Sequence, residues 1–321
     1  MRYKIPTPIP VSKNLLRPDQ ECWKTQELRV KEVQKITKGK GAKLCFLDDG
    51  IGDNEELLNL NIERWSYFSN APMIGRHSTF GATVVAGKTL GIFPEMDLVS
   101  KQVLMPDSGV GGTKEIVSAI RQANKMGIQT INLSLGSDYP DKHIERALQE
   151  YCSNGINIAT IASGNDGPGK NTTDYPARYA KTIKGVLSVA ATQIDRDGNI
   201  SVAMFSSRGI VTIGAPGHVL KSMNELSQID FISGTSFSAP IIGATIAVAR
   251  TLIDRDLTQD EIFGIIEETS KKGIDTKYNI GQGEISILDF LKRVKGLKSN
   301  PIKTPKTKKI KWICKILGCC K

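Results

Sequence analysis

The chain contains 321 residues, of which 40% are hydrophobic and 24% charged, and its formal net charge is +10 at pH 7. This length allows one large domain or two small ones, with enough apolar residues for a sizeable core. Apolar residues recur throughout the sequence, which excludes a chain that is disordered over most of its length. The sequence also excludes a membrane-spanning protein, because no run approaches the ~18–20 apolar residues of a membrane span.

The positive charge is concentrated at the two ends of the chain. Residues 1–43 have a balance of +7 and residues 298–321 one of +8, whereas residues 44–297 carry −5. A nucleic-acid-binding domain is expected to have a basic face on its folded body. We therefore predict no specific nucleic-acid partner. The alternative, salt-sensitive binding to nucleic acid, would have to depend on the two ends.

The N-terminus and the cysteines favour a cytoplasmic protein. The first residues lack the apolar stretch of a secretory signal, which is about 7–15 residues long. Cys22, Cys45 and Cys152 are far apart in the sequence, and the last two have apolar neighbours. They are more typical of reduced, buried thiols than of a disulfide framework.

Short apolar runs alternate with helical patterns along the chain. Strands are predicted at residues 43–47, 98–104, 130–135, 156–161, 186–191 and 210–213, and helices at 113–126, 143–152 and 238–253. This alternation predicts a three-layer α/β fold, in which a mostly parallel central sheet has helices on both faces. We predict one domain over residues 21–297, an N-terminal extension at 1–20 and a C-terminal tail at 298–321.

Four polar residues stand at positions that suit chemistry. Asp48 follows the first buried strand, His77 opens a helical segment, Asn165 follows a buried strand, and Ser236 precedes an apolar helix. Acyl transfer uses a nucleophile, a base, an acid that orients the base, and a donor for the oxyanion. Taken singly, each residue has a plainer interpretation as a turn residue, a surface histidine or a helix cap.

Only three histidines are available for the role of the base. His143 lies among charged residues on a helix that we expect to be solvated, and His218 lies in a turn after Pro216 and Gly217. His77 is followed by the small residues of a closely packed helix. If the chain has a catalytic histidine, His77 is therefore the best candidate.

Four segments, in this order, resemble the signatures of subtilisin-like serine proteases. They are D-x-G at 48–50, H-x-T-x-x-A at 77–82, S-G-N-x-G at 163–167 and G-T-S-x-S-A-P at 234–240. The order Asp, His, Ser along the chain is the order found in subtilisin. The resemblance extends over residues 30–295, nearly the whole predicted domain.

The resemblance implies a serine endopeptidase that acts on peptides or proteins. It implies that Ser236 attacks the substrate carbonyl, that His77 is the base, and that Asp48 orients His77. It further implies that Asn165 binds the oxyanion, and that Ser134, Leu135 and Gly136 pair with the substrate as an added strand. The alternative function is a catalytically silent peptide-binding module on the same fold.

Three further acids suggest which substrates are preferred. Asp49 beside Asp48 resembles the acid pair of kexin- and furin-like proteases, where the second acid faces a basic substrate residue. Asp174 and Asp166 match positions at the floor and rim of the family's primary specificity pocket. Such acids would favour Lys or Arg in the substrate. The plainer interpretation is that all three are turn aspartates.

The span from residue 86 to residue 94 is short. Many secreted relatives have a longer, Asn-rich calcium-binding loop there, so we predict no required cofactor and no obligatory metal. A structural calcium elsewhere stays as the alternative.

Both ends of the chain carry separate expectations. The short N-terminal extension resembles the intracellular branch of the family, and residues 2–10 are either an inhibitory segment in the active site or a disordered tail. Residues 306–321 form a basic amphipathic pattern that suits docking on an anionic membrane surface. The alternatives are a partner protein, nucleic acid or disorder.

Overall fold

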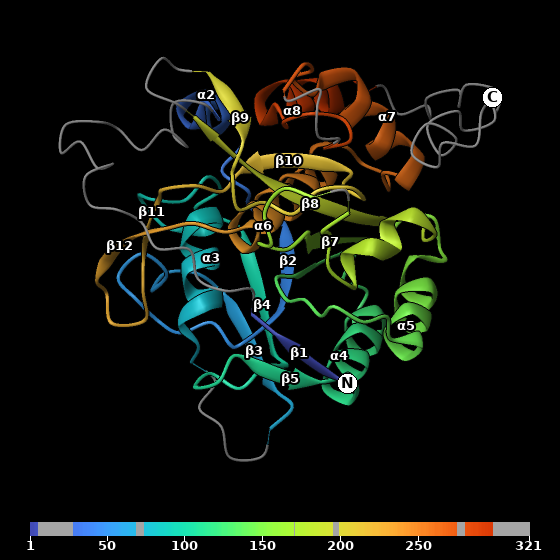
Figure 1. Cartoon of the computed structure of the whole chain (residues 1–321). Helices are drawn as coiled ribbons and strands as arrows, with labels where there is room; N and C mark the ends of the chain where they lie inside the picture. Colours follow the sequence, from blue (N-terminus) through green and yellow to red (C-terminus); the bar gives the residue numbers. More distant parts are fainter. Residues whose placement is uncertain (6–27, 69–73, 170, 195–198, 275–279, 298–321) are drawn as a thin grey trace, which may run out of the picture.

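The computed structural model describes residues 1–5, 28–68, 74–169, 171–194, 199–274 and 280–297 (Figure 1). Most of the predicted N-terminal extension and all of the C-terminal tail lie outside these residues. Within them, no helix is long and apolar enough to cross a membrane.

The centre of the molecule is an eight-stranded sheet with the order β10-β8-β7-β6-β2-β4-β3. All neighbours along this path are parallel, and β9 (Ile200–Val202) pairs antiparallel with β8. The parallel strands are β2 (Lys43–Asp48), β3 (Ile62–Ser66), β4 (Asp97–Gln102), β6 (Thr130–Leu133), β7 (Ile158–Ala162), β8 (Val186–Ile194) and β10 (Ile213–Pro216).

Helices cover both faces of this sheet, which confirms the predicted three-layer α/β fold (Figure 1). One side holds α4 (Thr113–Lys125) and α5 (Lys142–Cys152), and the other holds α2 (Val30–Ile36), α3 (Arg76–Ala86), α6 (Thr235–Ala249), α7 (Gln259–Thr269) and α8 (Ile287–Lys295). Successive side chains of a strand point to opposite faces. In β2, Leu44 and Phe46 accordingly join the core beneath α6, whereas Cys45 and Leu47 join the core beneath α4 and α5.

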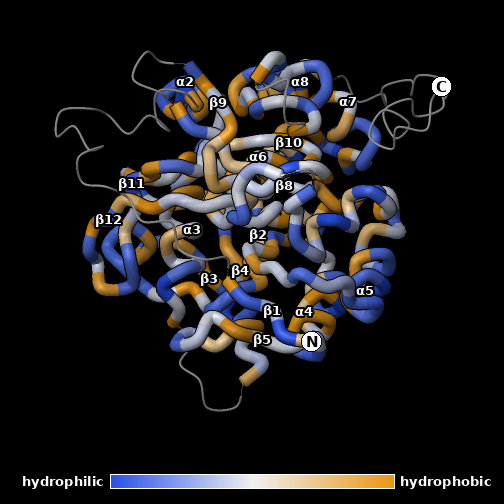
Figure 2. Tube along the Cα trace, in the orientation of Figure 1, coloured by the Kyte–Doolittle hydropathy of each residue, from blue (hydrophilic) through white to orange (hydrophobic). Residues whose placement is uncertain are grey.

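The helices differ in how deeply they lie. Figure 2 shows apolar residues along the central strands and many hydrophilic ones on the outer helix α5. In α5 only the stripe formed by Ile144, Ala147, Leu148, Tyr151 and Cys152 is buried. All fifteen residues of α6 are buried, as expected of a helix that is apolar on every side.

Two small sheets lie outside the main one. Strand β1 (Arg2–Lys4) pairs antiparallel with β5 (Val110–Gly112), and β11 (Leu220–Met223) pairs antiparallel with β12 (Ile229–Ile232). Neither sheet was predicted from the sequence.

The boundaries of two predicted elements were wrong. The strand predicted at 210–213 is found at Ile213–Pro216, where Gly214, Ala215 and Pro216 have the low strand propensity that hid it. The helix predicted at 238–253 begins three residues earlier, at Thr235, and ends at Ala249 before a 3₁₀ turn at Arg250–Leu252. Ser236 is therefore inside the first turn of α6 and does not merely precede it.

Candidate active site

Asp48 and His77 meet at the carboxyl end of the sheet. Asp48 is the last residue of β2, and His77 is the second residue of α3. The Nδ1 atom of His77 lies 2.9 Å from Oδ1 and 3.1 Å from Oδ2 of Asp48. The side chain of Asp48 is 1% exposed and that of His77 13% exposed. A buried carboxylate on Nδ1 fixes the tautomer that has its proton on Nδ1, so Nε2 is the nitrogen that can accept a proton.

This carboxylate also changes the basicity of the imidazole. Burial by itself would lower the pKa of His77, but the charge of Asp48 and the hydrogen bond to it, with the charge of Asp49, raise that pKa above its ordinary value. An imidazole with a raised pKa is a stronger proton acceptor, provided that the pH is high enough to keep it neutral.

Asp49 holds the beginning of α3. Its carboxylate accepts the backbone N–H groups of His77 at 3.0 Å and Ser78 at 2.9 Å, and the hydroxyl of Ser78 at 2.8 Å. These N–H groups have no partner within the helix. Gly75, just before α3, leaves room for this contact, because a Cβ atom there would lie 2.1 Å from Cγ of Asp49.

The position of Asp49 does not fit the predicted contact with a basic substrate residue. Asp49 is 1% exposed, and its carboxylate accepts hydrogen bonds from the first N–H groups of α3. Burial, followed by the charge of Asp48, raises the pKa of Asp49 to about 6. Asp49 therefore positions His77 through the backbone, a role that the resemblance to kexin- and furin-like proteases did not indicate.

Ser236 is the second residue of α6, and its neighbour in sequence contacts His77. The ring of Phe237, the next residue, packs on the imidazole of His77 with a centroid distance of 5.4 Å. The hydroxyl oxygen of Ser236 is buried, and no atom of the described residues hydrogen-bonds to it. The hydroxyls of Thr130 and Ser188 are also buried without a partner, so the place of Ser236, just before a residue that packs on His77, is what marks it as a candidate for function.

The backbone carbonyl of Ser236 is bonded to Ser134, the residue that follows β6. Pro240 lies inside α6 and has no N–H, so the carbonyl of Ser236 lacks its usual helical donor four residues on. The hydroxyl of Ser134 donates to this carbonyl at 2.8 Å, and the amide of Asn132 donates to the same hydroxyl at 2.9 Å. The side chain of Ser134 thus supports Ser236, while its backbone belongs to the predicted substrate-binding edge.

Asn165 lies across from the start of α6. Its Oδ1 accepts the N–H and the hydroxyl of Thr235, each at 3.0 Å. This network assigns the amide orientation and leaves Nδ2 as the donor end. Gly234 adopts φ of +154°, a value that favours glycine, and a Cβ atom there would lie 3.4 Å from Nδ2. The N–H of Thr235 donates to Asn165, and that of Phe237 donates to Gly234 at 3.1 Å. Nδ2 of Asn165 and the N–H of Ser236 are therefore the candidate donors for an oxyanion at this end of α6.

The predicted substrate-binding edge is paired with the chain's own N-terminus. The N–H of Lys4 donates to the carbonyl of Gly136 at 3.1 Å, and the N–H of Gly136 donates to the carbonyl of Lys4 at 3.0 Å. On its other side, β1 pairs with β5, and the N–H of Ile5 donates to Gly109. Residues 2–5 therefore form the middle strand between two edges, as an added peptide strand would.

Asp174 and Asp166 lie together, as predicted, and Asp138 joins them. Carboxylate oxygens of these three acids lie within 4.8 Å of one another. Asp174 approaches both the predicted substrate-binding edge and the loop before Asn165, since a Cβ atom at either Gly136 or Gly164 would lie 2.6 Å from its Oδ2. Burial, followed by the charge of Asp166, raises the pKa of Asp174 to about 8. Asp138 was missed, because one exposed acid in a turn has no distinguishing sequence signal.

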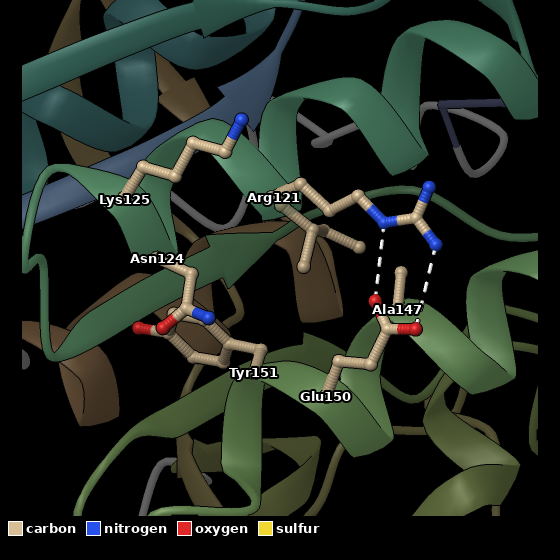
Figure 3. A pocket seen from close by; sticks show the side chains of 7 residues that line it. Arg121, Asn124, Lys125, Ala147, Glu150 and Tyr151 are labelled. Carbon is tan, nitrogen blue, oxygen red and sulfur yellow. Dashed lines mark hydrogen bonds and ion pairs between the residues drawn. The ribbon is translucent and has the colours of Figure 1, made fainter.

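The other two histidines, and a hollow between α4 and α5, do not belong to this group of residues. His143 is exposed on α5, and His218 is half-buried with Nδ1 2.9 Å from the hydroxyl of Ser233. A hollow between α4 and α5 contains the Arg121–Glu150 ion pair at 3.1 Å (Figure 3). None of the predicted site residues lines it, so we assign it no part in the chemistry.

Comparison with known proteins agrees with the site geometry. A model of the subtilase family matches residues 39–284, which is more than half of the chain. The chain belongs to the subtilase family. Thermitase of Thermoactinomyces vulgaris is 28% identical over 258 residues, covering 77% of this chain and 87% of thermitase. Subtilisin Savinase of Lederbergia lenta is 32% identical over 222 residues, covering 66% of this chain and 77% of that protein.

Subtilisin DY of Bacillus licheniformis is another relative, 29% identical over 260 residues that cover 78% of this chain and 90% of that protein. Membership and these relatives identify the present subtilase as a serine endopeptidase, a hydrolase of peptide bonds. Subtilases typically need no organic cofactor. The predicted likeness to the intracellular branch and to kexin- and furin-like proteases stays a prediction.

Proposed function

We propose that Ser236 is the nucleophile of this endopeptidase, that His77 is its general base and that Asp48 orients the base. The observation that carries this assignment is the imidazole whose Nδ1 is bonded to Asp48, packed against Phe237, the residue that follows Ser236 at the start of α6. Within the described residues the hydroxyl of Ser236 makes no hydrogen bond. Asp48 bonds to Nδ1 of His77, so Nε2 is the nitrogen that can accept a proton.

The chemistry follows from this arrangement. Oγ of Ser236 attacks the substrate carbonyl carbon while Nε2 of His77 takes the hydroxyl proton. The oxyanion that forms is stabilised by Nδ2 of Asn165 and by the N–H of Ser236. His77 then gives its proton to the leaving amine, the peptide C–N bond breaks, and an acyl-enzyme remains. Water, activated by His77, hydrolyses the ester and restores Ser236.

A fluorophosphonate probe tests the assignment. The full chain should be labelled at Ser236 and should cleave peptides, and both properties should disappear in Ser236→Ala. Ser153→Ala, at the exposed end of α5, is a matched control and should keep both. If the wild-type chain binds peptides but is neither labelled nor active, the alternative of a silent peptide-binding module is supported.

We also propose that the endopeptidase prefers Lys or Arg before the scissile bond. The carboxylates of Asp138, Asp166 and Asp174 are close enough to repel one another, and Oδ2 of Asp174 would lie 2.6 Å from a Cβ atom at Gly136 or at Gly164. A substrate cation placed among them would remove this repulsion and make charge-assisted hydrogen bonds. Asp49 is not part of this proposal, because its carboxylate is occupied by α3.

A peptide pair that differs only in charge tests this preference. Arginine and its neutral isostere citrulline have nearly the same shape, so their ratio of kcat/KM reports the charge. We expect arginine to be favoured by at least tenfold. A profile dominated by large apolar residues would refute the proposal.

We propose that the N-terminal extension inhibits the enzyme by occupying the edges with which a substrate strand would pair. Its support is that residues 2–5 form the middle strand between Gly136 and β5. Arg2 and Lys4 add positive charge near a body that is mildly acidic. A substrate strand cannot pair with the same edges while these residues occupy them. The alternative, a disordered tail, does not account for these backbone hydrogen bonds.

We propose that no metal is needed at the loop of residues 87–91. The carboxylate of Glu56 accepts the N–H of Thr89 at 2.7 Å, its hydroxyl at 2.5 Å and the N–H of Leu90 at 2.9 Å. These bonds use both carboxylate oxygens, so the side chain that closes the loop is a poor metal ligand. A structural calcium elsewhere in the chain stays as the alternative.

We further propose a cytoplasmic location, with residues 306–321 docking on an anionic membrane surface or on a partner. These residues lie outside the described part of the chain, so the proposal depends on their basic amphipathic pattern. Sedimentation with anionic vesicles, with and without residues 300–321, tests it. Equal recovery of both proteins in the supernatant would contradict membrane docking.

A further inference from the structure

The phenyl ring of Phe237 lies against two side chains of α3. Its centroid is 5.4 Å from that of the His77 imidazole, and the two ring planes are tilted by 46°. It is 6.5 Å from the centroid of the Phe80 ring, which is nearly perpendicular to it at 88°, an edge-to-face arrangement that aromatic pairs favour. Residues three apart on a helix lie on the same side of it. Phe80 therefore holds the ring of Phe237 against the helix that carries His77.

This contact is shielded from water. Phe237 is 6% exposed and Phe80 7% exposed, and both belong to the apolar cluster around α6. On the side of α6, the N–H of Phe237 donates to the carbonyl of Gly234 at 3.1 Å, which fixes the backbone from which the ring extends. The attraction between a cation and an aromatic ring is stronger where water is excluded than at an exposed site.

The charged groups that act on the imidazole come from β2 and the residue after it. Burial by itself would lower the pKa of His77, but the charge of Asp48, the hydrogen bond to it and the charge of Asp49 raise it. Arg76, the residue before His77, is paired with Glu225 at 3.0 Å. None of the fifteen residues of α6 is charged. From α6, the imidazole therefore meets an aromatic ring and not a charged side chain.

We propose that Phe237 is a positioning residue that stabilises His77 in its protonated form during peptide cleavage. The proposal rests on the proposed role of His77 as the general base. A phenyl ring attracts a cation within about 6 Å of its centroid, because the face of the ring carries partial negative charge. His77 becomes a cation when it takes the proton of Ser236. The ring therefore acts more strongly in the transition state than in the ground state, as a contribution to kcat requires.

Phe237→Leu removes the ring and keeps an apolar side chain. The acid limb of kcat/KM against pH, measured with the neutral citrulline peptide, reports the pKa of the base in the free enzyme. We expect this pKa to fall by about 0.3–0.7, and kcat at high pH to fall about two- to fivefold with a smaller change in KM. The difference in kcat/KM should shrink at low pH, because the variant keeps its base neutral to a lower pH. An unchanged pKa would overturn the proposal.

Fluorinated phenylalanines at position 237 give a second measurement that preserves the packing. Each added fluorine leaves the shape of the ring nearly unchanged but withdraws electrons from its face. We expect the pKa of the acid limb and kcat at high pH to decrease stepwise as the number of fluorine atoms increases. This result does not depend on whether Phe237→Leu folds normally. The absence of a trend, or a trend in the opposite direction, would overturn the proposal.

Phe93→Leu is the matched control, since Phe93 is 0% exposed and belongs to the same apolar cluster. It should lower stability and leave the pKa of the acid limb in place. An equal decrease of this pKa in Phe93→Leu would show that loss of any ring from the core has this effect, and would overturn the proposal. A wild-type chain that is neither labelled by the fluorophosphonate probe nor active would instead count against the proposed endopeptidase site itself.

Discussion

The backbone N–H of His77 donates to the carboxylate of Asp49 at 3.0 Å, while the imidazole of the same residue is bonded to Asp48. Two adjacent acids at the end of β2 thus hold one histidine in different ways. Asp48 orients the ring, and Asp49 fixes the helix terminus from which the ring extends.

Asp49→Ala should impair both stability and catalysis. Three donors of His77 and Ser78 would lose their acceptor, and the start of α3 would no longer be fixed. We expect the free energy of unfolding to fall by about 1–3 kcal/mol and kcat to fall more than KM rises. Urea denaturation and steady-state kinetics measure these changes. Asp53→Asn, an exposed acid nearby, should change stability by less than about 1 kcal/mol. A stable, fully active Asp49→Ala would contradict the positioning role.

Ser134→Ala should misplace Ser236, the proposed nucleophile. Because Pro240 removes the helical donor, loss of this hydroxyl leaves the carbonyl of Ser236 unpaired. We expect a loss of about 1–3 kcal/mol in stability and a fall in kcat. The control is Ser270→Ala, which removes another buried serine that donates to a backbone carbonyl, at 2.6 Å. The control should lose stability but keep kcat, and equal kcat values for both variants would refute the argument.

The preference for arginine over citrulline should increase with pH. Burial, followed by the charge of Asp166, raises the pKa of Asp174 to about 8, so the protonated form predominates below that value. Deprotonation restores the negative charge that attracts arginine. The ratio of kcat/KM should therefore rise between about pH 6 and 9. Titration of His77 affects both peptides and cancels in the ratio. Asp174→Asn should flatten this dependence, and a pH-independent wild-type ratio would contradict it.

The raised pKa of Asp174 also affects stability, and its sign can be stated. A carboxyl whose pKa is higher in the folded than in the unfolded chain binds its proton more tightly when folded. Its contribution to stability is therefore present at low pH and decreases as the pH rises from about 4 to about 8. Asp174→Asn should remove this part of the slope, as measured by urea denaturation across that range.

Removal of residues 1–10 should raise the rate of peptide cleavage. The edges formed by Gly136 and β5 would then be open to substrate. A synthetic peptide of residues 1–10, added to the shortened chain, should inhibit in competition with substrate. Loss of cooperative unfolding in the shortened chain would show instead that the segment is structural. Unchanged activity with no inhibition by the peptide would leave no inhibitory role for it.

A metal chelator should leave the melting temperature unchanged if the Glu56 loop replaces a metal site. Glu56→Ala should lower that temperature, because the N–H groups of Thr89 and Leu90 would lose their acceptor. Thermal unfolding with and without EDTA measures both effects. A large decrease with EDTA that calcium reverses would support the alternative of a structural calcium elsewhere.

The central sheet and its layers could be predicted from the sequence because their strands are buried on both sides. Such strands are continuous apolar runs, and runs of this kind are what local sequence reveals. The edge strand β3 was missed for the opposite reason, since residues 62–66 are only partly buried and Glu63, Arg64 and Trp65 give no apolar run. Strand β5, which consists of Val110, Gly111 and Gly112, owes its structure to the partner strand β1.

The site could be predicted only as far as motifs define it. Asp48, His77, Asn165 and Ser236 stand in recognisable segments, and the structure brings them to one end of the sheet. The role of Asp49 in fixing the start of α3 could not be predicted from its neighbours in sequence. Whether an acid faces a substrate or a helix terminus depends on residues 26–29 positions away, and only the folded chain brings these together.

The burial of α6 has a consequence for how the enzyme fails on heating. Ser236 stands in the first turn of a helix whose fifteen residues are all buried and which contacts five central strands. Elements that open locally are those with few buried contacts, so this helix cannot fray without loss of the main core. Inactivation by heat should therefore coincide with global unfolding, and no folded but inactive intermediate should accumulate with its nucleophile displaced.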